Sequence, residues 1–322
     1  MDNEILLPSY DVVVIGGGAA GLSGALMLAR SRRTVVVIDA GQPRNAPAEG
    51  VHGLLGHDGL PPGELLARGR TEVRHYGGSI VTGSVDQVAR TEDGFAVRLG
   101  DGRATSARRL LVTTGVVDEL PAIEGLAERW GRDVIHCPYC HGWEARDQAI
   151  GVLATGPMSI HQALLFRQLS DDVVFFTHGS DPTPESRDTL AAVGIGVVDG
   201  TVAAVEAADG RVSGVRLGDG TMVARQRLVV ASRPVARADF LRGLGLELVE
   251  HPSGAGQHLP VDGMGRTEAA GVWAAGNVTE PFAQVGAAAA AGAFAAAQIN
   301  ADLVFEQTRL AVAAARTEPA HH

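Results

Sequence analysis

The chain has 322 residues, enough for two domains with cores of their own, and its 45% hydrophobic and 20% charged residues are typical of a globular protein. Its formal net charge is −10, and the sequence contains no lysine. The acidity argues against a nucleic acid as a partner, because phosphate binding needs a basic face. The lack of lysine excludes mechanisms that use a lysine Schiff base or a P-loop lysine.

Two segments bear on where the protein resides. Residues 1–10 contain Asp2 and Glu4 and lack the basic start and apolar core of a secretory signal. The one candidate membrane stretch, residues 281–299, is mostly alanine, which favours a tightly packed interior helix. We therefore expect a cytoplasmic protein that binds no membrane. In that compartment a disulfide is usually transient and catalytic.

The first motif along the chain is a strand–turn–helix–strand unit. The apolar run 11–15 predicts a buried parallel strand, a helix extends to about Arg32, and residues 34–38 predict a second strand. The turn after the first strand is Gly16-Gly17-Gly18-Ala19-Ala20-Gly21. A glycine-rich turn in this full context indicates a dinucleotide site.

Individual residues of this unit suit the phosphates and a ribose. Gly16 permits the tight turn, Gly18 lets the backbone approach a pyrophosphate, and Gly21 lets the helix pack on the strand. The start of the helix supplies amide donors and partial positive charge. Asp39, which follows the second strand, is placed to accept hydrogen bonds from a ribose diol.

A middle section, residues 50–116, alternates short predicted strands with Asp-Gly turns. The strands are expected at 79–88, 95–99 and 109–112. The section ends in Leu110-Leu111-Val112-Thr113-Thr114-Gly115. An apolar strand with this ending would close a dinucleotide domain where the chain touches the cofactor.

The only two cysteines, Cys137 and Cys140, are separated by two residues. No metal site is expected, because a structural zinc site needs four ligands and the crowding of His136, Cys137, Cys140 and His141 disfavours a tetrahedral shell. Two buried apolar cysteines are an alternative that leaves the absence of all other cysteines unexplained. We predict a redox-active dithiol/disulfide.

A second strand–turn–helix–strand unit spans residues 149–177, but its turn is defective as a nucleotide site. Ala154 takes the position of the first glycine, and Ser159 that of the helix-packing glycine. The second strand ends in Thr177-His178-Gly179-Ser180-Asp181. This ending has no acid for a ribose and no arginine cluster for a 2′-phosphate.

The last third predicts strands at 201–205, 211–217 and 228–231, and then a strand that ends in Ala275-Gly276-Asn277 before the alanine-rich helix. These elements predict an α/β protein with two Rossmann-like domains of three layers (ββα). The first domain is discontinuous, residues 1–116 and 245–322. The second, residues 117–244, is inserted into it and carries the cysteine pair.

The motifs together resemble the low-molecular-weight thioredoxin reductases, a family of flavoproteins, over nearly the whole chain. The resemblance implies a homodimer and an FAD whose pyrophosphate and ribose are held by Gly16, Gly18 and Asp39. The segment 113–115 resembles the family's Ala-Thr-Gly. Asn277 stands where the family has Asp, and it retains an oxygen for the ribityl chain.

Three departures from that family concern its redox partners. The family's reductases have an acid after the second cysteine, where this chain has His141. Their glycine-rich NADPH loop corresponds here to Ala-Thr-Gly-Pro-Met-Ser (154–159), and their His-Arg-Arg cluster to residues 178–180. Without the phosphate cradle and its counter-charge, we predict inefficient NADPH binding.

Residues 137–144, Cys-Pro-Tyr-Cys-His-Gly-Trp-Glu, resemble a subgroup, the FAD-dependent dithiol oxidases that form disulfides in gliotoxin, holomycin and romidepsin. Residues 39–45 resemble that subgroup's FAD loop. This likeness implies oxidation of a small-molecule dithiol, with electrons passing through the cysteine pair and FAD to O2, which yields H2O2. The FAD contacts it implies are Gly16, Gly18, Ala19, Ala20, Asp39, Ala40, Gln42, Arg44, Asn45, His52, Val85, Thr113, Thr114, Gly115, Gly276, Asn277, Gln284 and Val285.

The resemblance also implies that Cys140 faces the flavin and that Cys137 exchanges with the substrate. Thiolates are the reactive species, so a base is needed; His141 is the candidate and His136 a weaker alternative. A histidine that only orients the loop is the alternative, and Glu144 either orients His141 or faces solvent. Two other functions stay open: a thioredoxin-type disulfide reductase that uses NADPH or another donor, and a non-catalytic flavin redox sensor.

Overall fold

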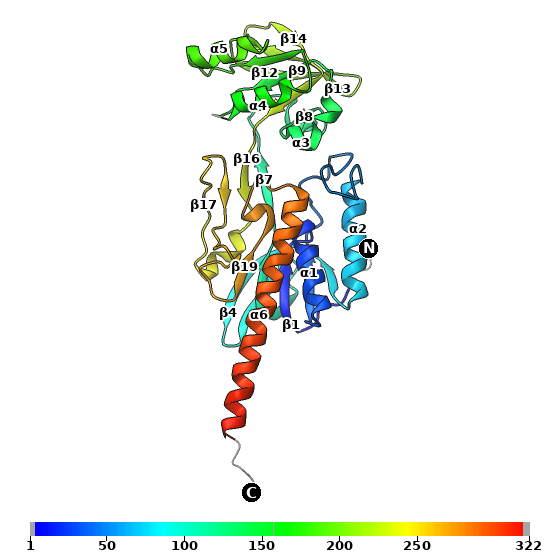
Figure 1. Ribbon diagram of the computed structural model, residues 1–322, viewed down its shortest axis with the longest axis vertical. Coiled ribbons are helices and arrows are strands. Elements are labelled where there is room, and N and C mark those ends of the chain that lie inside the picture. Colours follow the sequence, from blue (N-terminus) through cyan, green and yellow to red (C-terminus); the bar gives the residue numbers. More distant parts are fainter. Residues whose placement is uncertain (1–3, 157, 318–322) are drawn as a thin grey trace. The chain divides into compact units, whose positions relative to one another are not determined.

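The computed structural model describes residues 4–156 and 158–317, so the start of the N-terminal segment and Pro157 of the second turn lie outside the described residues. The chain divides into two compact units (Figure 1). Unit 1 comprises residues 1–44, 63–117 and 235–322, and unit 2 comprises residues 45–62 and 118–234.

These boundaries differ from the predicted ones in two places. Residues 45–62, expected in the first domain, belong to unit 2, where His52 pairs with Glu144. Residues 235–244, expected in the inserted domain, belong to unit 1, because Leu241 is fully buried in the core of that unit. Both differences arise from tertiary contacts that follow no local pattern in the sequence.

Unit 1 is built on a seven-stranded sheet in the order β3-β2-β1-β6-β5-β4, with β19 also paired to β6. The pairs formed among β1, β2, β3, β6 and β19 are parallel, whereas β4, β5 and β6 pair antiparallel. The valine-rich runs of β1 and β2 suit strands that are buried on both faces. The strands are β1 Ser9–Ile15, β2 Val35–Asp39, β3 Ser79–Thr82, β4 Val85–Thr91, β5 Gly94–Leu99, β6 Ala104–Val112 and β19 Val272–Ala274.

A smaller sheet, in the order β17-β18-β16-β7, contains two of the four places where the chain passes between the units, those at residues 117–118 and 234–235. Its strands are β7 Val116–Glu119, β16 Arg233–Ala236, β17 Val249–Glu250 and β18 Gln257–His258. Two 3-10 helices of unit 1 complete this part of the chain, η3 Asp239–Leu244 and η4 Gly276–Val278.

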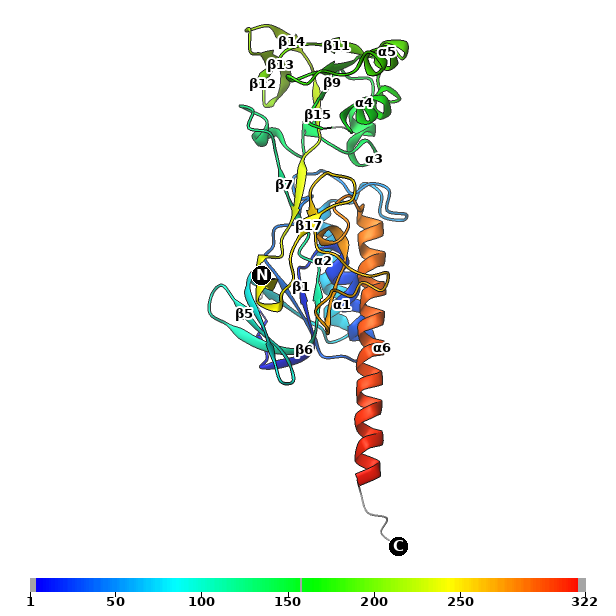
Figure 2. The ribbon, with the colours of Figure 1, turned by 90° about the vertical axis from the view of Figure 1, so that its left-hand side faces the viewer.

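Helices α1 (Ala19–Arg30) and α6 (Val285–Thr317) lie side by side in unit 1 (Figures 1 and 2). Glycine allows their backbones to approach closely. A Cβ on Gly292 would lie 2.0 Å from the carbonyl oxygen of Ala20, and one on Gly24 would lie 3.0 Å from that of Gly292. This contact fixes the start of α1 against α6.

The alanine-rich helix is longer than predicted. The part of the helix up to Leu303 is a core helix, in which Ala295, Ile299 and Leu303 are buried, whereas Phe305 is 70% exposed. Beyond the core, its acids form ion pairs with β6, including Arg108 to Glu306 at 2.6 Å. By length and composition α6 is the one helix among the described residues that could cross a membrane, a test that core helices of soluble proteins also satisfy.

Helix α2 (Pro62–His75) was not predicted, because residues 50–116 were expected to hold only strands. The side chains of Leu66 and Val73 form the buried face of α2. They are the only large apolar side chains of the helix that are buried, so the helical periodicity in the sequence is weak.

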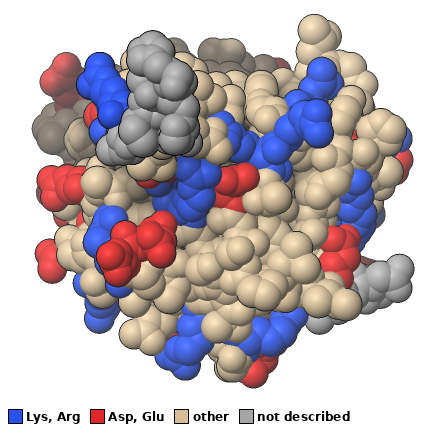
Figure 3. Space-filling view, turned by 90° about the horizontal axis from the view of Figure 1, so that it is seen from below, with Lys and Arg blue, Asp and Glu red and all other residues tan. Residues whose placement is uncertain are grey.

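Charged residues of both signs are interspersed on the face of the molecule seen in Figure 3.

Unit 2 contains a five-stranded parallel sheet in the order β11-β10-β9-β15-β8 and a three-stranded antiparallel sheet, β12-β13-β14. The strands are β8 Val134–Ile135, β9 Ile150–Leu153, β10 Val173–Phe176, β11 Gly196–Val198, β12 Val202–Ala208, β13 Arg211–Leu217, β14 Met222–Ala224 and β15 Arg227–Val230. The helices are η1 Ala127–Arg129, α3 Pro138–His141, η2 Trp143–Ala145, α4 Ser159–Arg167 and α5 Pro184–Ala192. The predicted α/β class is confirmed.

Candidate functional site

The glycine turn of unit 1 leaves the start of α1 open to a ligand. Gly16 has φ +107°, and a Cβ there would lie 2.4 Å from the carbonyl oxygen of Thr113, so this position requires glycine. A Cβ on Gly21 would lie 1.9 Å from the carbonyl oxygen of Gly16. A Cβ on Gly18 would meet no protein atom within 4 Å, and no side chain caps the helix. The uncapped N–H groups and the open space beside Gly18 suit a pyrophosphate, which fits the expected FAD.

Asp39, expected to bind the ribose, is held at the end of β2 by three donors. Its Oδ1 accepts from the N–H groups of Gly17 and Gly41, each at 3.2 Å, and its Oδ2 pairs with Nη2 of Arg70 at 3.1 Å. A carboxylate offers about four acceptor positions, which leaves room for a ribose hydroxyl. Arg70 was missed in the sequence because it belongs to α2, the helix that was not predicted.

Thr113 and Thr114 use their hydroxyl groups to shape the chain. Thr113 Oγ1 donates to the carbonyl of Gly16 at 2.9 Å, and Thr114 Oγ1 donates to the carbonyl of Arg237 at 2.6 Å. Gly115 follows with φ +70°. These residues therefore support the glycine turn through hydrogen bonds between chain segments.

The structure separates the residues that were predicted to contact FAD into two groups. Asn45 and His52 belong to unit 2. The side chain of Val85 packs against the core of unit 1. The members that unit 1 contains are Gly16, Gly18, Ala19, Ala20, Asp39, Ala40, Gln42, Arg44, Val85, Thr113, Thr114, Gly115, Gly276, Asn277, Gln284 and Val285.

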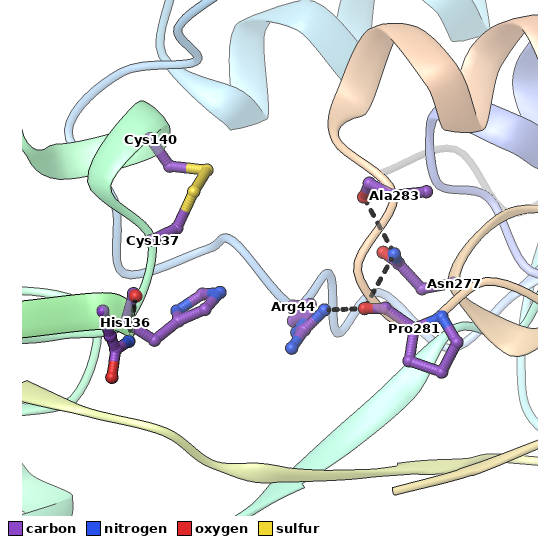
Figure 4. The surroundings of a disulfide bond; sticks show 8 residues. Arg44, His136, Cys137, Cys140, Asn277, Pro281 and Ala283 are labelled. Carbon is purple, nitrogen blue, oxygen red and sulfur yellow. Dashed lines mark hydrogen bonds between the residues drawn. A yellow bond between two sulfur atoms is a disulfide. The ribbon is translucent and has the colours of Figure 1, made fainter. Parts of the chain in front are cut away.

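Asn277 closes the turn that precedes α6 (Figure 4). Its Nδ2 donates to the carbonyls of Pro281 at 3.2 Å and Ala283 at 2.9 Å. It also donates to the carbonyl of Glu280 at 3.1 Å. Arg44 Nη1 donates to the Pro281 carbonyl as well, at 2.7 Å. The three carbonyls explain why an amide stands here, because a carboxylate has no N–H to donate. The amide Oδ1 stays available as an acceptor, as expected for the ribityl chain.

We expect Asn277→Asp to destabilise FAD-free protein by about 1–3 kcal/mol and to weaken FAD retention, because a carboxylate cannot donate and would be held against three carbonyl oxygens that repel it. Urea unfolding of the FAD-free variant measures the first effect and its bound flavin the second. Asn300→Asp is the matched control, since Asn300 Oδ1 accepts from Arg33 at 2.7 Å and an Asp would keep that acceptor. Equal stability of the two variants would contradict the role assigned to Asn277.

In unit 2, Cys137 and Cys140 form a disulfide (Figure 4). Cys137 precedes the short helix α3, and its carbonyl accepts from the N–H of His141 at 3.1 Å. Gly142 completes the turn, because a Cβ there would lie 2.1 Å from the carbonyl oxygen of Pro138. The predicted pair is therefore poised to exchange electrons through sulfur.

His141 carries a buried imidazole. Both ring nitrogens are buried and find no hydrogen-bond partner among the described residues. Burial lowers the pKa of His141, the carboxylate of Glu144 opposes this shift, and His52 and Arg227 add to it. The depressed pKa favours the neutral imidazole near pH 7, the form that accepts a proton from a thiol.

The neighbours of the disulfide have other surroundings. The ring of His136 stacks on Trp130 with centroids 5.5 Å apart, which gives it a packing role. Tyr139 and Trp143 are 67% and 66% exposed. The Arg146 guanidinium lies 4.2 Å from the Trp143 ring centroid. Neither aromatic side chain is part of the core of unit 2.

The degenerate loop of unit 2 is closed by its own serine. Ser159 is 1% exposed, and its Oγ accepts from the N–H groups of Thr155 at 3.0 Å and Gly156 at 3.2 Å. These are loop amides that a glycine at this position would leave free for a phosphate. The sequence shows that a glycine is missing here. Only the structure shows that the Ser159 hydroxyl accepts hydrogen bonds from the N–H groups of Thr155 and Gly156.

At the end of β10, His178 is not placed to supply a positive charge to a phosphate. His178 Nδ1 accepts from the N–H of Val202 at 3.1 Å, which requires that nitrogen to be unprotonated. Burial lowers the pKa of His178, which favours the same neutral form. The residue is therefore fixed as an acceptor in this fold.

Comparison with known proteins agrees with these motifs. A family model described as "Pyridine nucleotide-disulphide oxidoreductase" matches residues 10–297. The chain belongs to the pyridine nucleotide-disulphide oxidoreductase family. It is similar to thioredoxin reductase sirT of Leptosphaeria maculans, with 31% identity over 90% of this chain and 93% of that protein. It is also similar to thioredoxin reductase tcpT of Claviceps purpurea, with 34% identity over 74% of this chain and 78% of that protein.

Solved structures give the same result for this family member. The crystal structure of HlmI has a TM-score of 0.90 and 46% identity, and the match covers 98% of this chain and 99% of that one. The oxidoreductase from Agrobacterium tumefaciens has a TM-score of 0.87 and 37% identity, covering 92% and 99%. The predicted resemblance to thioredoxin reductase-like flavoproteins is confirmed, and the protein is an oxidoreductase.

Proposed function

We propose that this protein is an FAD-dependent dithiol oxidase that converts a small-molecule dithiol to an intramolecular disulfide. The observation that carries the proposal is the contrast between the two glycine-turn motifs. The turn at Gly18 is open and uncapped, whereas the loop amides of Thr155 and Gly156 are occupied by Ser159. One dinucleotide is therefore expected to bind, and NADPH is not the expected electron donor.

The cysteine pair supplies the exchange chemistry. A substrate thiolate attacks Sγ of Cys137, the Cys137–Cys140 bond breaks, and a mixed disulfide forms. The second substrate thiolate then displaces Cys137, which releases the substrate disulfide and leaves two reduced cysteines. FAD bound in unit 1 would accept their two electrons and pass them to O2, which gives H2O2 and restores the enzyme disulfide.

The chain's own residues provide the conditions for this exchange. His141 would take the thiol proton, since its lowered pKa keeps the imidazole neutral. Gly16, Gly18 and Asp39 would hold the pyrophosphate and ribose. The subgroup resemblance of residues 137–144 supports a small dithiol as substrate. A homodimer stays an expectation from the family resemblance, and a cytoplasmic location stays a prediction from the sequence.

Anaerobic flavin reduction tests the proposal. Purified FAD-loaded protein is mixed first with NADPH and then, in a separate sample, with dithiothreitol, while flavin absorbance is recorded. We expect bleaching by the dithiol alone, reversed by air with release of H2O2. Rapid bleaching by NADPH would establish a disulfide reductase instead. If neither reagent reduced the flavin, the redox sensor would be the better description.

A further inference from the structure

The segment that leads from Asn277 into α6, residues 277–284, lies beside the glycine turn of unit 1. Gly276 precedes this segment and packs on the first turn of α1, where a Cβ on Gly276 would lie 2.8 Å from Cβ of Ala20. The amide of Asn277 then binds carbonyls within the segment (Figure 4). Residues 277–284 therefore adjoin the end of α1 at which a dinucleotide is expected to bind.

A hairpin of unit 1, formed by β17 and β18, runs against this segment. The N–H of His251 donates to the carbonyl of Gly256 at 2.9 Å, which closes the loop between the two strands. Directly after β18, the N–H of Leu259 donates to the carbonyl of Val278 at 2.8 Å. Leu259 is fully buried in the core of unit 1, so the end of the hairpin is fixed beside the segment.

Two histidines of the hairpin contact the segment through their ring nitrogens. Nδ1 of His258 lies 2.9 Å from the carbonyl oxygen of Thr279, and because a carbonyl only accepts, this nitrogen carries a hydrogen and donates it. Nε2 of His251 lies 3.5 Å from Oε2 of Glu280. Nδ1 of His251 accepts from the N–H of Ser253 at 3.2 Å, so the hydrogen of the neutral ring is on Nε2 and faces the carboxylate.

The rings also pack on one another and on the segment. The ring centroids of His251 and His258 are 5.1 Å apart at an interplanar angle of 78°, and those of His251 and Phe282 are 5.6 Å apart at 75°. Edge-to-face arrangements of this kind are favourable for aromatic rings. Oε1 of Glu280 accepts from the N–H of Phe282 at 3.4 Å. The hairpin therefore holds three of the four successive residues 279–282.

We propose that His251 and His258 are positioning residues for FAD, which act through the segment 277–284. The inference rests on the FAD binding of the proposed function. Nδ2 of Asn277 donates to three carbonyls of this segment, which requires the segment to keep its path. The hydrogen bond of His258 and the contact of His251 with Glu280 fix that path from the hairpin. They thereby hold the Asn277 amide, and with it the free Oδ1, in one orientation.

The proposal is tested by FAD release from full-length, FAD-loaded variants. His258→Leu removes the donor to the Thr279 carbonyl, whereas His258→Asn keeps an N–H donor near the position of Nδ1. Glu280→Gln turns an amide N–H toward the N–H of His251, and it should fold because the Glu280 side chain is 55% exposed. Gln257→Leu is the matched control, since Gln257 precedes His258 on β18 and its Nε2 bonds Oε1 of Glu250 across the hairpin at 3.0 Å.

Two quantities are recorded for each variant. The rate of FAD release is measured from the flavin that stays with the protein after dilution and rapid filtration. The visible absorption spectrum of the retained flavin reports its surroundings, which a purely structural role of the histidines would leave unchanged.

We expect His258→Leu to release FAD at least about 10-fold faster than the wild type and to shift the absorption bands of the retained flavin, because one buried hydrogen bond is lost. Glu280→Gln should release FAD about 3-fold faster, as suits a half-exposed pair. His258→Asn should restore the wild-type spectrum and most of the wild-type retention, and Gln257→Leu should behave as the wild type does.

Three results would overturn the proposal alone: wild-type release from His258→Leu, equal release from the Leu and Asn variants of His258, or equally fast release from Gln257→Leu. If His258→Leu failed to fold, release from Glu280→Gln would decide, and a wild-type rate there would count against the proposal. If the wild-type protein retained no FAD, the proposed function would fail and this inference with it.

Discussion

Replacing Cys140 by serine is expected to reduce dithiol-dependent flavin bleaching by at least about 10³-fold, because a hydroxyl cannot take part in disulfide exchange. The chain contains no third cysteine that could take over. Anaerobic stopped-flow absorbance with dithiothreitol measures the loss. Normal bleaching in Cys140→Ser would refute the assigned electron path.

The same variant separates loss of chemistry from loss of fold. The disulfide links residues three apart in sequence, so it constrains a very small loop and contributes little to the stability of the chain. Cys140→Ser should therefore bind FAD and unfold as reduced wild-type protein does. Treatment with a small disulfide should trap Cys137 as a stable mixed disulfide, visible by mass spectrometry. A variant that bound no FAD would show that its low activity came from misfolding.

Motifs with strong local patterns could be predicted from the sequence. The valine runs of β1 and β2 and the glycine turn between β1 and α1 depend on near neighbours, so both strands and the turn were found. Helix α2 was missed because only Leu66 and Val73 mark its buried face. The length of α6 was underestimated because the helix past Ile299 is joined to β6 by ion pairs such as Arg108–Glu306, which link residues distant in sequence.

The sequence predicted which residues belong to the site, but not which groups those residues contact. The cysteine pair and the damaged loop at Ser159 were identified, since both depend on residue identity. The hydrogen-bond partners of these residues could not be identified from the sequence, because a hydrogen bond from the N–H of Gly156 to a serine hydroxyl forms only in the folded loop. His52 shows the same limit: its place in unit 2 and its pairing with Glu144 are not marked by any local pattern in the sequence.

Gly18→Val is expected to weaken FAD binding by more than about 100-fold while leaving the FAD-free fold intact. Gly18 has φ −78° and ψ −171°, an extended conformation that valine adopts readily. Since no neighbouring segment lies within 4 Å of the new Cβ, the free energy of unfolding of FAD-free protein should change by no more than about 1 kcal/mol, mainly because valine is a poorer N-cap than glycine. The valine methyl groups would instead fill the space expected for the pyrophosphate.

Two further glycines serve as references for this variant. Gly63→Ala adds a side chain where no neighbouring segment lies within 4 Å, on α2 rather than in the turn, and should leave FAD binding unchanged. Gly21→Ala should impair both stability and FAD binding, because its Cβ would lie 1.9 Å from the carbonyl oxygen of Gly16. Fluorescence titration with FAD measures the affinity for FAD. Urea unfolding of the FAD-free proteins measures the free energy of unfolding. Only a ligand that approaches the backbone at Gly18 produces lost affinity with unchanged stability, so wild-type FAD affinity in Gly18→Val would exclude a pyrophosphate at this turn.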